Sequence, residues 1–195
     1  MYLLAKHPEV QNKLREEVRA GLPSLAAASD PSTDLAGILE SFPLLNAVCL
    51  ETLRLYPTVP VSLRVANKDT TIGSVFVPKG TRAYLVPWAI NRSEKFWGPT
   101  AAEFRPERWI DKETGRANNT GGAASNYNIL TFLHGPRSCI GEKFAKAELK
   151  SLLAVFCGTF SMTMADPKEV PIPYGALTVK PKDGMHLRLK AVEGW

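Results

Sequence analysis

The sequence is poor in the features that mark several common classes of protein. Its 195 residues include only three cysteines and no CxxC pair, which argues against a disulfide framework and against structural zinc. No apolar run approaches the roughly 18 residues that span a bilayer, and we expect neither a signal peptide nor a membrane anchor in this chain. Lys and Arg exceed Asp and Glu by only 24 to 19, so no nucleic-acid partner is expected. What remains, with 45% hydrophobic and 22% charged residues, is the composition of a folded globular protein.

The spacing of apolar residues predicts a mainly helical chain with small β-sheets, an α+β fold. Val10, Leu14 and Val18 recur at every fourth position and predict a helix that begins near Pro8. Further helices are predicted at 35–40, 43–55 and 140–156. The helix at 43–55 is apolar on all sides, which indicates that it is buried. Strands are predicted from alternating or short β-like runs at 59–65, 71–77, 81–86, 159–164, 176–180 and 185–190.

The connecting segments add two predictions. Turn-forming residues at 77–80 and 181–184 predict hairpins between the β-like runs on either side of them. Residues 91–131 show no clear period, and their polar part at 111–127 is predicted to be a surface loop. The length of the chain suits one domain or part of a larger one, and we expect residues 1–195 to form a single partial domain.

A cysteine between two glycines carries most of the chemical information. Cys139 lies just before the last predicted helix, where backbone N–H groups and the helix dipole favour a thiolate. Gly135 and Gly141 let the backbone approach a large flat group, and Arg137 can reach an acidic group at its edge. Taken alone, Cys139 is interpreted more simply as a buried cysteine at a helix start. Chance seldom produces the complete spaced set, and it therefore favours a binding site. Its members are Phe132, Gly135, Arg137, Cys139 and Gly141.

This spacing resembles FxxGxRxCxG, the signature of the cytochrome P-450 superfamily of haem-thiolate monooxygenases. The resemblance implies that the Cys139 thiolate is the axial ligand of the iron in haem b, iron protoporphyrin IX. It also implies that Arg137 pairs with a haem propionate and that Phe132 packs beside the cysteine loop. Arg64 matches a second propionate-binding arginine of the family, whereas His134 is interpreted as a loop residue and not a ligand. The implied cofactor-binding set is Cys139, Arg137, Arg64, Phe132, Gly135 and Gly141, and no catalytic residue is assigned in this chain.

A second motif of the same family, ExxR, lies on the predicted buried helix as Glu51 and Arg54. Their spacing places both side chains on one helix face. An exposed ion pair there would contribute little, but the apolar neighbours indicate burial, where charges must be fully paired. The resemblance implies that Arg108 is the third member of this structural network, in a segment like FxPERF with Trp109 as its last residue. Asn91 stands where the family pattern WxxHR usually has histidine, which leaves its contact open.

The resemblance covers nearly the whole chain but only the C-terminal part of the family's fold. It implies a haem-binding part of a monooxygenase that inserts one oxygen atom from O2 into a small organic substrate. Two alternatives stay open: a haem-thiolate isomerase or dehydratase, and an inactive truncated fragment. The A/G-G-x-D/E-T-T pattern that delivers protons in the family is not found, so we expect this chain alone to be inactive.

The resemblance also implies an electron donor and a cellular location. The donor is an NADPH-dependent reductase, and the full-length parent is expected at the cytosolic face of the endoplasmic reticulum membrane. Lys143, Lys146 and Lys150 follow Cys139 at helical spacing and predict a basic stripe that docks an acidic electron donor, with an ordinary solvated helix face as the alternative.

Overall fold

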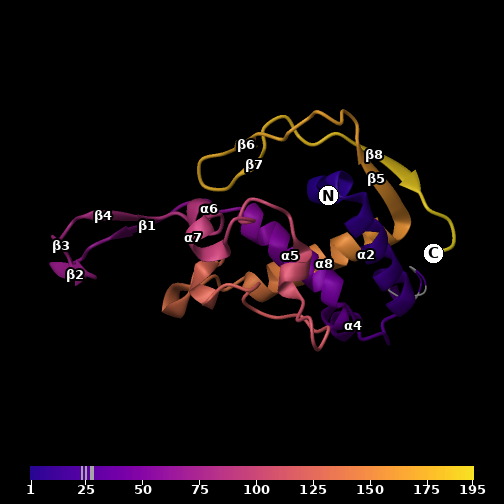
Figure 1. The fold of residues 1–195 in the computed structure, drawn as a ribbon, viewed down its shortest axis with the longest axis horizontal. Coiled ribbons are helices and arrows are strands. Elements are labelled where there is room, and N and C mark those ends of the chain that lie inside the picture. Colours follow the sequence, from indigo (N-terminus) through magenta and orange to yellow (C-terminus); the bar gives the residue numbers. More distant parts are fainter. Residues whose placement is uncertain (23, 25, 27–28) are drawn as a thin grey trace.

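Helices form the body of the molecule, and short antiparallel sheets lie around it (Figure 1). The computed structural model describes residues 1–22, 24, 26 and 29–195. Its helices are α1 (Tyr2–Lys6), α2 (Pro8–Gly21), α4 (Leu35–Ser41), α5 (Pro43–Leu55), α6 (Pro87–Ile90), α7 (Glu94–Trp97) and α8 (Glu142–Thr159), with the 3-10 helices η1 (Pro106–Trp109), η2 (Asn126–Asn128) and η3 (Gly135–Arg137). Its strands are β1 (Ser62–Val65), β2 (Thr70–Ile72), β3 (Val75–Val77), β4 (Arg82–Leu85), β5 (Phe160–Met164), β6 (Pro173–Tyr174), β7 (Lys180–Pro181) and β8 (Leu187–Ala191). This architecture confirms the predicted fold class.

The helices lie close to the positions predicted from the sequence. The helix α8 begins later than predicted, because Gly141 is its N-cap and the residues before it form a loop. The short helices α1, α6 and α7 were not predicted, since each is too short to show a period. Within the described residues no single helix is long and apolar enough to cross a membrane; α4 and α5 pass that test only as a pair bent by 80°.

Glu17 of α2 joins that helix to the start of α5. Both helices begin with proline, Pro8 and Pro43, whose fixed φ and missing N–H suit the first helical position. The carboxylate oxygens of Glu17 accept hydrogen bonds from the N–H groups of Leu44 and Leu45, each at 2.8 Å. Because these N–H groups have no partner within α5, a neighbouring helix supplies the cap.

The main hydrophobic core lies between α2, α5, α8 and β5. Gln11 is buried inside it. Its Nε2 donates to the carbonyl of Leu4, and its Oε1 accepts from the N–H of Met162 in β5 at 2.8 Å. Every polar atom of this amide is thus given a partner, as burial requires. The most deeply buried members of the core include Leu14, Val18, Leu45, Cys157 and Met162.

Arg19 fixes the C-terminal residues against α2. Its Nη2 donates to the carbonyls of Gly158 and Val192, both at 2.7 Å, and its Nη1 donates to the carbonyl of Glu193 at 2.8 Å. The ring of Trp195 lies directly against Gly158, where any larger residue would overlap it. The C-terminal residues are therefore fixed against α2 and the end of α8. In Figure 1 the C-terminus lies near α2.

The first predicted hairpin, with its turn at 77–80, was wrong. The strand β1 pairs with β4, and β2 pairs with β3, so the run predicted as one strand at 71–77 is itself a hairpin. The chain reverses at Gly73, whose φ of +60° glycine adopts readily. A turn does form at 77–80, where the N–H of Thr81 donates to the carbonyl of Pro78, but it connects two different sheets.

The second predicted hairpin, around 181–184, was also wrong. The strand β7 pairs with β6, and β8 pairs with β5, so the runs on either side of this turn do not pair with each other. Alternating apolar residues and turn residues indicate where a strand lies. They do not indicate its partner strand, because pairing depends on contacts between residues far apart in the chain. In Figure 1 the β6–β7 hairpin forms an arch that stands apart from the β5–β8 pair.

Candidate cofactor site

The loop that carries Cys139 is closed by its own backbone. The N–H of Cys139 donates to the carbonyl of Phe132 at 2.8 Å, and the N–H of Ser138 donates to the carbonyl of Gly135 at 3.0 Å. Gly135 has a φ of +79°, which favours glycine, and open space lies where a side chain would be. The loop therefore presents Cys139 at its end, just before α8.

The chemistry of this loop fits a large flat group that is apolar at its centre and acidic at its edge. Cys139 is a free, exposed thiol, and Arg137 is exposed two residues before it. Two apolar side chains that follow are also open to solvent: Ile140 is 105% and Phe144 is 74% exposed. Haem is one group that fits this set, because a thiolate can ligate its iron, a guanidinium can pair with its acidic edge and apolar side chains can cover its faces.

Arg64 is not brought to this loop by any contact in the described part of the chain. It lies on β1, in the arm that projects away from the helices in Figure 1. Its Nη1 donates to the hydroxyl of Ser62 at 2.8 Å and to the carbonyl of Leu63 at 2.9 Å. A role for Arg64 in binding a propionate therefore stays a prediction.

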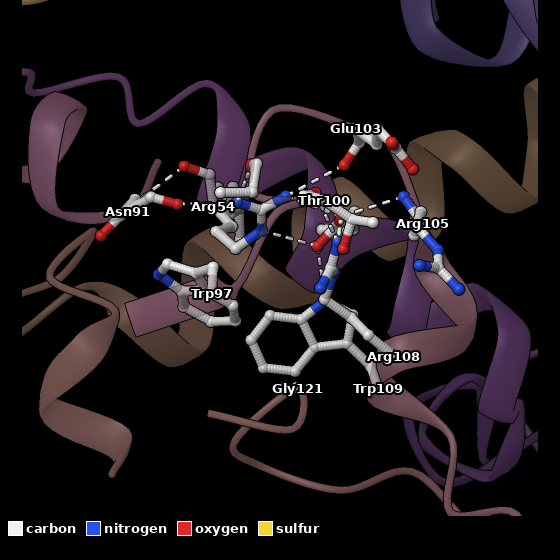
Figure 2. A network of polar contacts seen from close by, with 12 residues as sticks. Arg54, Asn91, Trp97, Thr100, Glu103, Arg105, Arg108, Trp109 and Gly121 are labelled. Carbon is white, nitrogen blue, oxygen red and sulfur yellow. Dashed lines mark hydrogen bonds and ion pairs between the residues drawn. The ribbon is translucent and has the colours of Figure 1, made fainter. Parts of the chain in front are cut away.

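Glu51, Arg54 and Arg108 meet in one buried network, shown from close by in Figure 2. The side chains of Glu51 and Arg54 are both 0% exposed. Arg54 donates to both carboxylate oxygens, with Nε at 2.8 Å and Nη2 at 2.9 Å, and Arg108 Nε donates to Oε1 at 3.0 Å. The N–H of Arg105 and the indole N–H of Trp109 add two donors at 2.9 Å. One carboxylate thus joins α5 to η1 and the residue before it.

Arg54 uses every donor of its guanidinium. Besides its bonds to Glu51, it donates to the carbonyls of Asn91 at 2.7 Å, Ala101 at 2.6 Å and Glu103 at 3.1 Å. These carbonyls belong to the irregular stretch after α6, which has little regular backbone pairing of its own. Arg54 therefore replaces secondary structure in that stretch by binding its backbone directly.

The charges around Glu51 lower the pKa of its carboxyl group. Burial alone raises the pKa of an acid, since it disfavours the charged form. Here that effect is outweighed by hydrogen bonds and charge from Arg54, the N–H of Arg105 and the indole of Trp109, so that the pKa lies below its ordinary value. Glu51 is therefore an anion in the folded protein at neutral pH.

The lowered pKa of Glu51 predicts how the stability of the fold depends on pH. A carboxyl whose folded-state pKa is depressed contributes stability above its unfolded pKa of about 4.3, and that contribution is lost as the pH falls through the folded value. Trp109→Phe removes one donor, so we expect acid unfolding to begin at higher pH, with a loss of about 1.5–3 kcal/mol at neutral pH. Urea denaturation followed by circular dichroism at a series of pH values measures both quantities.

Trp97→Phe is the matched control for this experiment. Trp97 is buried, as the residues of the network are, and its ring packs against Trp109. Its indole N–H donates to the carbonyl of Asn128 at 3.2 Å and not to Glu51. This control variant should lower the free energy of unfolding by the same amount at every pH, whereas Trp109→Phe should also make that free energy depend less steeply on pH in the acid range. The same change of slope in both variants would show that packing, and not the charge of Glu51, sets the acid limit.

Trp109 and Asn91 are the network residues that the sequence did not reveal. Trp109 is 0% exposed, and a side chain at Gly121, whose φ is +59°, would press on its indole. The surface loop therefore rests on the network at that glycine. The available signal was that both residues depart from the family pattern: Trp109 brings an N–H where phenylalanine has none, and Asn91 brings an amide in place of an imidazole.

Asn91 connects the network to the cysteine loop. It is fully buried, and its Nδ2 donates to the hydroxyl of Thr131 at 2.9 Å, while its Oδ1 accepts from the N–H of Leu130 at 2.8 Å. The hydroxyl of Thr131 donates in turn to the carbonyl of Leu53 at 2.8 Å. Thr131 directly precedes Phe132, so α5 holds the start of the loop that carries Cys139.

The predicted basic stripe on α8 is largely neutralised. Lys146 pairs with Glu142 at 2.6 Å, and Lys150 pairs with Glu40 of α4 at 2.6 Å. Glu142 is one turn before Lys146 on the same face of α8, so the stripe includes an acid as well as lysines. Of the three lysines, only Lys143 has no ion pair among the described residues.

Cys49 and Cys157 are buried, in contrast to Cys139. Burial raises the pKa of the Cys49 thiol to about 12 and that of the Cys157 thiol to about 11. Both are therefore uncharged at neutral pH and inaccessible to reagents, as expected for core residues.

We expect a thiol reagent to label one cysteine in the folded, haem-free protein. Iodoacetamide at neutral pH should modify Cys139 and leave Cys49 and Cys157 unmodified until the protein is unfolded, because only exposed thiols react readily. Peptide mass spectrometry reads the three sites separately. Haem should protect Cys139 if its sulfur is the ligand. Labelling of Cys139 at the same rate with and without haem would contradict that assignment.

Comparison with known proteins identifies the family to which this arrangement belongs. The sequence profile of the cytochrome P-450 family matches residues 1–188. The chain belongs to the cytochrome P-450 family. Cytochrome P-450 monooxygenase sphH of Aspergillus fumigatus is 49% identical over 100% of this chain and 35% of its own length. Cytochrome P-450 monooxygenase ptmK of Penicillium ochrochloron is 45% identical over 98% of this chain and 37% of its own length.

This P-450 chain therefore spans little more than a third of the length of the curated relatives it matches. The family consists of haem-dependent oxidoreductases in which the cofactor supplies the difficult chemistry and the protein supplies ligand, orientation and electrostatic environment. The described residues include the cysteine loop and the network that holds it.

Proposed function

We propose that this chain is the haem-binding part of a cytochrome P-450 monooxygenase and that the Cys139 thiolate is its iron ligand. The observation that carries the proposal is the exposed thiol of Cys139 at the end of a closed loop, which Asn91 and Thr131 attach to a fully buried network. A ligand loop must be held in place, because a thiolate that moves by a fraction of an ångström changes its bond to iron.

Each residue of the loop has a distinct role in this proposal. Cys139 supplies the sulfur, and Arg137 is placed to pair with a carboxylate at the edge of the bound group. Phe132 fixes the amide of Cys139 through its carbonyl, at 2.8 Å. Bound haem supplies the activation of O2 in this family, and the thiolate favours that chemistry by donating electron density.

The proposed overall reaction transfers one oxygen atom from O2 to a small organic substrate. The second oxygen atom leaves as water, with two electrons from NADPH that arrive through a reductase and two protons from the medium. The support for this reaction is the family membership and the similarity to sphH and ptmK, which are both named as monooxygenases. The face of α8 that was predicted to dock the electron donor is mixed in charge and not uniformly basic, because Glu142 pairs with Lys146 there.

The test uses the protein expressed from its complete coding sequence, loaded with haem and combined with a P-450 reductase and NADPH. We expect a product that contains one atom of isotopically labelled oxygen when the gas phase is labelled O2, and no product without the reductase. Product formed without reductase or O2 would favour a haem-thiolate isomerase or dehydratase. Failure to bind haem at all would contradict the proposal in every form.

A further inference from the structure

Leu133 has a backbone conformation that is unusual for its type. Its φ is +59°, and among the described residues it is the only one besides glycines with a positive φ. A bulky side chain in this left-handed region is strained, because its Cβ approaches the following carbonyl. Leu133 directly follows Phe132, whose carbonyl accepts the N–H of Cys139. The strain is thus located one residue from the bond that closes the cysteine loop.

His134, the next residue, is bonded in a way that its interpretation as an ordinary loop residue did not predict. Its Nε2 lies 3.0 Å from the carbonyl oxygen of Asn126 and 2.9 Å from that of Ile129. Both neighbours are acceptors, so Nε2 carries the proton and donates to them. The imidazole ring also packs on Tyr127, with 4.7 Å between ring centroids. We refer to the two bonds from Nε2 as the His134 bridge.

The His134 bridge and Asn91 hold the same segment from opposite ends. Asn91 binds Leu130 and Thr131 on the network side, whereas the bridge draws His134 back to the turn at 126–129. Leu133 lies between these two attachments. Its left-handed backbone therefore persists because both neighbours are fixed, as strained residues require.

We propose that His134 is a positioning residue for Cys139. By donating to the carbonyls of Asn126 and Ile129, it keeps Leu133 in its strained conformation and so keeps the Phe132 carbonyl turned toward the N–H of Cys139. The functional part of this inference rests on the proposed role of Cys139 as iron ligand. The His134 bridge itself is a property of the haem-free protein and can be tested without haem.

The decisive variants are His134→Gln and His134→Met, which have nearly the same shape. The amide of glutamine carries two N–H donors that can reach both carbonyls, whereas methionine has none. In the haem-free protein expressed from its complete coding sequence, we expect hydrogen exchange at the Cys139 amide to be about tenfold faster in His134→Met. In His134→Gln it should stay within about twofold of the parent.

The haem-loaded protein gives a second, spectroscopic result. Reduced haem with carbon monoxide has a different Soret band when its ligand is a thiolate than when the thiolate is lost or protonated. We expect His134→Met to lose a large part of the thiolate band within hours of storage and His134→Gln to keep it. If the parent lacks a thiolate band but the exchange results hold, Cys139 is not the ligand and the His134 bridge still stands.

Leu133→Gly tests the strain. With glycine at this position the left-handed backbone is unstrained, so the double variant Leu133→Gly/His134→Met should exchange more slowly at Cys139 than His134→Met alone. Equal behaviour of His134→Gln and His134→Met in both measurements would overturn the proposal. So would loss of folding in both single variants that Leu133→Gly does not rescue, because the donor would then not be the property that matters.

Discussion

Glu51→Ala should lower the free energy of unfolding by about 3–5 kcal/mol, the cost of removing one member of a buried charge network. Its removal leaves Arg54 and Arg108 without their anion, and the guanidinium of Arg54 is 0% exposed. Arg54→Ala should cost a similar amount, since three carbonyls lose their donor with it. Arg108→Ala should cost less, because its side chain is 11% exposed and water can replace part of what is lost. Urea denaturation of the purified variants measures each value.

A double-mutant cycle shows whether these residues act as one unit. We expect Glu51→Ala combined with Arg54→Ala to cost clearly less than the sum of the two single changes, because the second removal relieves an unpaired charge. Glu107→Ala is the matched control. Glu107 lies on the same 3-10 helix and pairs with Arg105, but those side chains are 61% and 45% exposed, so its loss should cost under about 1 kcal/mol. Small, additive effects throughout would show that the network does not support the fold.

Cys139→Ser should abolish the thiolate form of the haem complex and all turnover that depends on it. A serine oxygen is a harder and weaker donor to iron than a thiolate, so serine would not supply the electron density that Cys139 would give to the cofactor. The carbon monoxide spectrum of the reduced protein measures the ligand directly. Cys157→Ala is the control, since it removes a buried thiol of α8 and should change stability but not the spectrum. A thiolate spectrum that survives Cys139→Ser would mean that another residue ligates the iron.

Both predictions concern residues that local sequence patterns could indicate. The spacing of Glu51 and Arg54 on one helix face, with apolar neighbours, predicts a buried pair. The structure brings Arg108 to the same carboxylate. The further donors from Trp109 and the backbone of Arg105 were not predictable, since they come from a segment whose conformation has no period and is fixed by the network itself.

Two of the errors arise from contacts between residues far apart in the chain. Glu142 and Glu40 neutralise two lysines of α8, and Glu40 belongs to another helix, so counting charges along α8 could not reveal it. The prediction of strand pairing failed because β8 pairs with β5, and the whole β6–β7 arch lies between them in the chain. The backbone of Leu133 is a third case, since nothing in the sequence indicates a leucine with a positive φ.

The attachment of the C-terminal residues to Arg19 has a consequence for synthesis on the ribosome. The helix α2 is made well before the carbonyls of Val192 and Glu193 that bind Arg19. At about 5–20 residues per second, the interval between them is roughly ten to thirty-five seconds. During that time the guanidinium of Arg19 and the surface that Trp195 covers have no native partner. The nascent chain therefore exposes this surface until residues 192–195 have left the ribosome, and a chaperone that binds it earlier would have to release it before the contact can form.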